Sequence, residues 1–118
     1  MSTRRLIVNA DDMGLHPGIN AGILHCHRDG IVTSASLCAG GAAFDDAALG
    51  LKASGLDMGV HLTLSGEAAV APASALPTLA PEGRLPVYFT ALFGGLLTGR
   101  IKTEEVEREL TAQLSRVA

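Results

Sequence analysis

Aromatic residues are scarce in this chain of 118 residues, which has no tryptophan, one tyrosine and three phenylalanines. Apolar residues nevertheless make up 47% of the sequence. A core can therefore form, but it must be built from alanine, valine, leucine and isoleucine. Because the length corresponds to about one domain, we expect residues 1–118 to form a single domain.

Basic blocks, paired-cysteine motifs and long apolar runs are also missing. The formal charge is -3, which argues against a nucleic-acid partner. Cys26 and Cys38 lack Cys-x-x-Cys spacing, which predicts buried thiols in a reducing compartment rather than a disulfide or a zinc site. The apolar stretch 85–101 is short and is interrupted by Pro86 and three glycines. No secretory apolar region follows the N-terminus, so we expect a cytoplasmic protein without a membrane span.

The segment 5–15, RLIVNADDMGL, places two adjacent carboxylates directly after a short apolar run. The run predicts a strand buried on both faces, as in a parallel sheet. Asp11 and Asp12 repel each other, and a metal cation would compensate this repulsion. The alternative is that one aspartate caps the following helix while the other is solvated.

Strand-like and helix-like segments alternate over the first half of the chain. The expected order is the apolar strand, a helix over 17–29, a strand over 31–38, a helix over 44–53 and a strand over 57–62. This order predicts parallel βαβ units in an α/β fold. Because right-handed crossovers bring the carboxyl ends of the strands to one edge, Asp11, Asp12 and His61 should meet there.

The second half of the chain has a different pattern. Residues 65–86 are rich in proline, alanine, glycine and serine, so we expect a long loop or flap over 65–100, within which the apolar segment 87–97 forms either a short helix or a hydrophobic flap. Thr103 should cap a final helix with an apolar stripe, formed by Val106, Leu110, Leu114 and Val117. Since a complete (β/α) barrel needs about 250 residues, we expect the N-terminal part of such a barrel, truncated at its C-terminal end.

A carboxylate and an imidazole at one edge of a sheet can hold a divalent cation such as Mg, Mn, Zn or Fe. The second carboxylate could then act as a general base. His61 alone is weak support, because a single histidine at a strand end is more often structural. His16, at the start of the expected helix, could contact substrate.

Thr63 and Glu67 follow His61 closely in the sequence. Their hydroxyl and carboxylate could orient the histidine or line a substrate pocket.

Three segments together resemble the YdjC-like (ChbG-type) carbohydrate deacetylase family: Asn9–Gly14, Pro17–Asn20 and Gly59–Glu67. Within that family the sequence is most similar to the hopanoid-biosynthesis-associated HpnK proteins. The resemblance implies a metal-dependent enzyme of carbohydrate metabolism that removes acetyl groups from N-acetylated amino sugars. It also implies a barrel-like fold and a homodimer.

By this resemblance Asp12 and His61 would be metal ligands and Asp11 the catalytic base, with Mg or Zn as the expected metal. The family's third ligand is a histidine in a later segment that this chain does not contain.

Three functions remain open from the sequence. The first is hydrolysis of the acetyl group of an N-acetylated amino sugar or glycolipid. The second is a binding or self-association module that uses the apolar segment 87–97 and the last helix. The third is another metal-dependent activity, such as that of a phosphoesterase or an oxygenase, because the same ligand types serve all of these.

Overall fold

The computed structural model describes residues 4–118, which form two compact units. The first unit contains the residues up to Cys38 together with Ala42–His61. The second contains Ala39–Gly41 and Leu62–Ala118. The expectation of a single domain stays a prediction.

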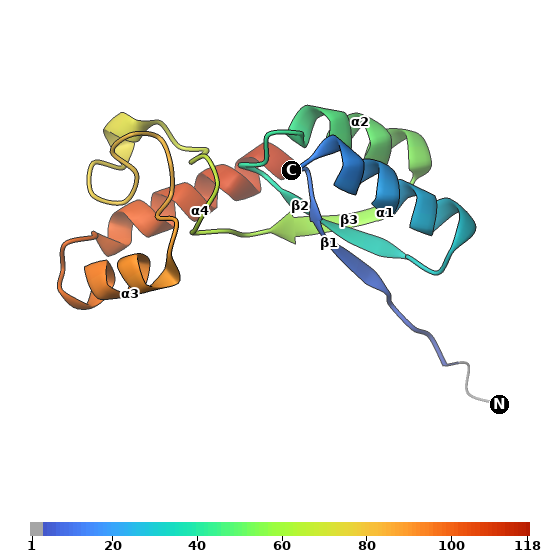
Figure 1. Cartoon of the computed structure of the whole chain (residues 1–118), viewed down its shortest axis with the longest axis horizontal. Coiled ribbons are helices and arrows are strands. Elements are labelled where there is room, and N and C mark those ends of the chain that lie inside the picture. The colour runs from blue at the N-terminus through green and yellow to red at the C-terminus, as the bar shows by residue number, and fades with distance from the viewer. Residues whose placement is uncertain (1–3) are drawn as a thin grey trace. The chain divides into compact units, whose positions relative to one another are not determined.

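The first unit is a three-stranded parallel sheet with two helices on one of its faces (Figure 1). Its elements in chain order are β1 (Asn9–Met13), α1 (Pro17–Asp29), β2 (Ser34–Cys38), α2 (Phe44–Ser54) and β3 (Asp57–His61). The strand order β1-β2-β3 brings the carboxyl ends of all three strands to one edge. The predicted parallel α/β architecture is therefore confirmed.

Helix α1 begins and ends where local sequence signals place it. The Nδ1 atom of His16 accepts the Gly18 N–H at 3.0 Å and so caps the helix. Pro17 occupies the first helical position, where its missing N–H costs nothing. His27 and Arg28 lie in the last turn, near the partial negative charge of the helix end.

The prediction for the first strand is wrong in its position and its burial. Strand β1 begins at Asn9, so Asp11 and Asp12 lie within it rather than after it. Leu6 and Ile7, which we expected to be buried, are 79% and 78% exposed. One face of this sheet carries hydrogen-bonded polar side chains, so the strand is not apolar on both sides.

Two smaller expectations need similar correction. Strand β2 begins at Ser34 rather than Ile31, which is exposed. Cys26 is exposed on α1, whereas Cys38 is buried as predicted.

The second unit is built around its own apolar core. Its elements are a 3₁₀ turn η1 (Ala73–Ala75), α3 (Phe89–Leu97) and α4 (Thr103–Val117). The segment expected to be a long loop is irregular in backbone but contributes much of this core, which contains Ala71, Leu76, Leu79, Ala80, Leu85, Leu92 and Ile101. Within residues 4–118, no helix has both the length and the apolar character needed to cross a membrane.

Helix α4 buries a polar stripe beside part of the predicted apolar one, of which Val117 is buried and Val106 packs against the core. Glu105, Glu109 and Gln113 are buried at intervals of four residues, while Leu114 is 48% exposed. The glutamates accept hydrogen bonds from backbone amides of the preceding loop, which have no secondary-structure partners. The helix N-cap is Lys102, without a side-chain cap, so the capping role predicted for Thr103 is also wrong.

Glu105 should make the stability of the protein depend on acid pH. Burial raises the pKa of its carboxyl, but hydrogen bonds from the Leu79 and Thr78 amides, with the Thr78 hydroxyl and Arg108, lower it below the ordinary 4.5. A lowered folded-state pKa means stability that is present above pH 4.5 and lost as the pH falls through the folded pKa. We expect urea unfolding to show this loss as the pH falls below 4.5, and Glu105→Gln to flatten the slope. Identical slopes for the two proteins would contradict this role.

Candidate metal centre

The exposed face of the sheet in the first unit carries a row of hydrogen-bonded polar side chains. Ser34 Oγ donates to Asn9 Oδ1 at 2.6 Å, and Asn9 Nδ2 donates to Asp11 Oδ1 at 2.8 Å. Ser36 Oγ also donates to Asp11 Oδ1, at 2.6 Å. One oxygen of Asp11 is therefore held by two donors from two strands, which fixes the orientation of the carboxylate.

The regular pairing of β1 with β2 is interrupted near Asp12, and the backbone of Asp12 does not have regular strand geometry. The pairing shifts between Ala10 and Met13, and Asp12 has a φ of 67°. This is the left-handed region, which is strained for most residues but which aspartate and asparagine tolerate better. Successive side chains of a regular strand point to opposite faces, so this irregularity lets Asp12 reach His61 on the face that also carries Asp11.

The backbone that follows the two aspartates passes very close to β2. Gly14 has a φ of 97°, and a Cβ at this position would lie 3.0 Å from the carbonyl oxygen of Cys38. Only glycine fits this conformation and this space without a shift of one strand end.

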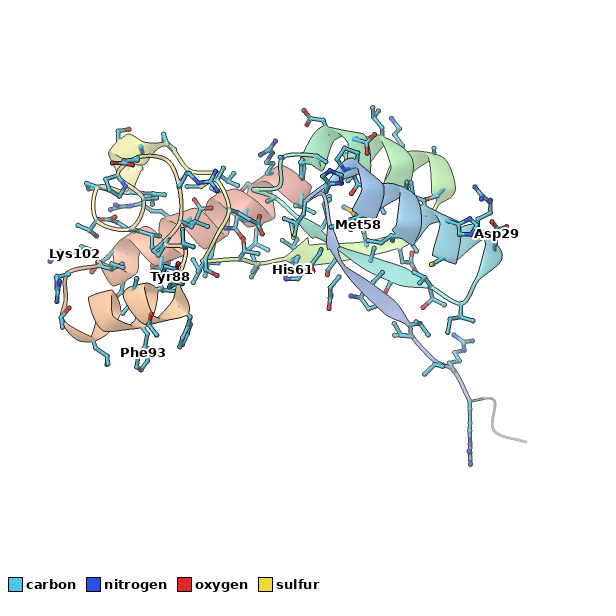
Figure 2. All side chains as sticks on the ribbon, in the orientation of Figure 1. Asp29, Met58, His61, Tyr88, Phe93 and Lys102 are labelled. Atoms are coloured by element: carbon cyan, nitrogen blue, oxygen red, sulfur yellow. The ribbon has the colours of Figure 1, made fainter. Side chains whose placement is uncertain are left out.

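His61 is the last residue of β3 and lies at the carboxyl edge of the sheet (Figure 2). Its Nδ1 atom lies 3.8 Å from Asp12 Oδ1 and 3.1 Å from Ser36 Oγ. The structure thus brings together the aspartate pair and the histidine that the strand order predicted at one edge.

Cys38 completes a cluster of three side chains that could hold a metal. One ligand atom each of Asp12, Cys38 and His61 lies within 4.8 Å of the other two. Cys38 is the last residue of β2 and the direct neighbour of His61 in the parallel register. The sequence offered no motif for this role, because the cysteine stands alone and only the strand register brings it to the site.

Two neighbours of His61 require different protonation states of its Nδ1 atom. Ser36 gives its only hydroxyl proton to Asp11, because a carboxylate can only accept, so its oxygen accepts Nδ1–H at 3.1 Å. The Asp12 amide nitrogen, 3.4 Å away, would instead need a lone pair on Nδ1. The two contacts correspond to different tautomers of His61, and each tautomer leaves one ring nitrogen with the lone pair that a cation requires.

Asn20 is a positioning residue that the sequence did not reveal. It is buried in α1 and accepts the Gly14 N–H at 2.7 Å through its Oδ1. Its Nδ2 donates to the Ala43 carbonyl at 3.1 Å and to Asp46 Oδ2 at 2.8 Å. One side chain therefore ties the end of β1 to α2, and nothing local in the sequence indicates these distant partners.

The three predicted substrate-binding residues lie in different settings. His16 is exposed and its Nδ1 caps α1. Thr63 and Glu67 belong to the second unit, where Glu67 is half-buried and its carbonyl accepts the Leu85 N–H at 2.9 Å. The Thr63 hydroxyl is buried and has no hydrogen-bond partner within residues 4–118. Substrate contact by these three residues stays a prediction.

A comparison with protein families matches residues 5–118 to the family described as YdjC-like protein. The chain belongs to the YdjC-like family. This match includes the whole of the candidate metal centre, and it agrees with the resemblance carried by the segments around Asp11, Asp12 and His61.

Several YdjC-like relatives are carbohydrate deacetylases by name. The chain is 44% identical to carbohydrate deacetylase 1 of Listeria innocua, over 96% of the chain and 45% of that protein. It is 43% identical to a chitooligosaccharide deacetylase of Klebsiella pneumoniae, over 96% of the chain and 43% of that protein. The chain therefore spans less than half the length of these relatives.

A solved structure from Enterococcus faecalis supports the fold. The solved protein is named for cellobiose-phosphate cleavage, is 31% identical to this YdjC-like chain and matches it with a TM-score of 0.79. The match covers 98% of the chain and 44% of the solved protein. The parallel α/β arrangement thus corresponds to part of a YdjC-like structure.

Proposed function

We propose that this YdjC-like chain carries the metal-binding and proton-transfer groups of a hydrolase that removes the acetyl group of an N-acetylated amino sugar or glycolipid. The observation that carries the proposal is the convergence of Asp12 and His61 beside Asp11. Relatives named carbohydrate and chitooligosaccharide deacetylases support the substrate class. The relation to HpnK proteins, a cytoplasmic location and a homodimer belong to the same proposal.

The residues present suit a divalent cation. Asp12 offers a carboxylate oxygen, which binds magnesium or zinc, and His61 offers an imidazole nitrogen, which binds zinc. A bound cation would polarise the acetyl carbonyl and make hydroxide available near neutral pH.

In this proposal Asp11 is the general base. Its Oδ1 is held by Asn9 and Ser36, and the carboxylate is exposed at the surface of the sheet. The fixed orientation lets the carboxylate take a proton from a water molecule without first having to reorient. Two adjacent aspartates would thus have separate roles, one in binding metal and one in moving a proton.

Removal of metal is expected to abolish acetate release. Because the chain spans 45% of the Listeria innocua relative, the test uses the chain itself and a fusion that completes it with the C-terminal remainder of that relative. Both are assayed on N-acetylated chitooligosaccharides. We expect a chelator to lower acetate release by the fusion at least about 100-fold, and zinc or magnesium to restore it.

Assays of the same two proteins distinguish the deacetylase from the alternative functions. Activity that resists the chelator contradicts metal dependence, and a folded fusion that releases no acetate contradicts the deacetylase. Release of phosphate from a phosphorylated sugar would instead favour a phosphoesterase.

A further inference from the structure

The buried thiol of Cys38 faces a polar, charged neighbourhood rather than an apolar core. Cys38 is fully buried, yet a ligand atom of Asp12 and one of His61 lie within 4.8 Å of its ligand atom and of each other. In the parallel register Cys38 pairs with His61, and Ser36, two residues earlier on the same face, contacts both His61 and Asp11. A cysteine that served only to fill a core would more commonly have apolar neighbours on that face.

We propose that Cys38 is a third protein ligand of the metal centre and that its thiolate makes the centre selective for zinc over magnesium. This inference rests on the proposed metal centre of Asp12 and His61. Magnesium binds oxygen ligands in octahedral geometry, whereas zinc binds thiolate, imidazole and carboxylate together in tetrahedral sites. The three side chains supply one ligand of each of these types.

The charges of the three ligands balance those of a divalent cation. On binding, the S–H bond of Cys38 breaks, a sulfur–zinc bond forms and the proton goes to solvent. The Asp12 carboxylate and the Cys38 thiolate then carry two negative charges, and the neutral imidazole of His61 carries none. The buried thiolate is compensated by the cation, which an isolated buried charge would not be. In the chain itself a fourth position remains for water or substrate, as catalytic zinc requires.

Cobalt(II) is a suitable probe because thiolate ligation gives an intense near-ultraviolet charge-transfer band that oxygen and nitrogen ligands do not give. The unmodified chain and the Cys26→Ser control should both show this band with one cobalt per chain. Cys38→Ser should lose the band and bind zinc about 100-fold more weakly or worse, since loss of a residue that merely orients a ligand already costs 10–100-fold. Circular dichroism checks the fold of each variant.

A second measurement does not depend on the folding of the Cys38 variant. The Cys26→Ser chain has Cys38 as its only cysteine. X-ray absorption of its zinc complex should show a sulfur neighbour at about 2.3 Å.

The other possible outcomes contradict either the role of Cys38 or the three-residue metal centre. A shell of nitrogen and oxygen alone, or zinc affinity unchanged in Cys38→Ser, overturns the role of Cys38 and leaves the Asp12–His61 centre standing. A folded chain that binds neither cobalt nor zinc overturns the three-residue centre, and acetate release by the fusion then decides separately whether the proposed function survives.

Discussion

Asp12→Asn should reduce metal-dependent acetate release by the fusion by on the order of 10³-fold or more, because it removes the charged ligand that holds the cation. Asparagine is the appropriate replacement, since it tolerates the left-handed φ of 67° that this position requires. The variant should therefore fold normally, and its unfolding midpoint in urea should stay close to that of the parent. The loss can then be assigned to the missing carboxylate charge rather than to strain in β1.

Asp29→Asn is the matched control for this experiment. Asp29 lies at the far end of α1 from His61 in the same unit, as Figure 2 shows, and its ion pairs with Arg28 and His25 are exposed. Exposed pairs contribute little to stability, so activity and folding should be unchanged. Full metal content and full activity in Asp12→Asn would exclude Asp12 as a ligand.

Glu109→Ala should lower the free energy of unfolding by about 3–5 kcal/mol, because it leaves several buried donors without an acceptor. Glu109 is fully buried and accepts from the Val70 and Ala71 amides at 3.0 and 2.9 Å and from Gln113 Nε2 at 2.7 Å. These hydrogen bonds fix the loop to α4 within the second unit. Urea unfolding followed by circular dichroism measures the change.

Two further variants test the specificity of this effect. Glu107→Ala, at an exposed position of the same helix, should change the free energy of unfolding by less than about 0.5 kcal/mol. Glu109→Gln keeps the volume but replaces one acceptor oxygen by a donor, so an intermediate loss is expected. A loss below about 1 kcal/mol in Glu109→Ala would show that water replaces the carboxylate easily.

The sequence by itself determined the alternation of elements in the first unit. Pro17 and Gly30 delimit α1 at the residues where local signals predict its ends. Such signals act over one or two turns of chain, so they can be read without knowledge of distant partners. The handedness of parallel crossovers then places Asp11, Asp12 and His61 at one edge, because strand ends follow from the order of elements.

Only the tertiary structure decided which side chains meet at that edge. Cys38 reaches the candidate metal centre through its register with His61, and the break in β1 brings Asp12 to the face that carries Asp11 and His61. A register shift of one residue reverses the face of every side chain in a strand, and no local pattern in this sequence fixes it.

The buried face of α4 was also decided by distant partners. Apolar periodicity favoured the stripe that includes Leu114, but the unpaired amides of the loop needed acceptors. Burying Glu105 and Glu109 satisfies those amides, and an unsatisfied buried amide costs as much as a lost hydrogen bond. That requirement arises only when the loop and the helix are packed together, which is why the sequence alone did not reveal it.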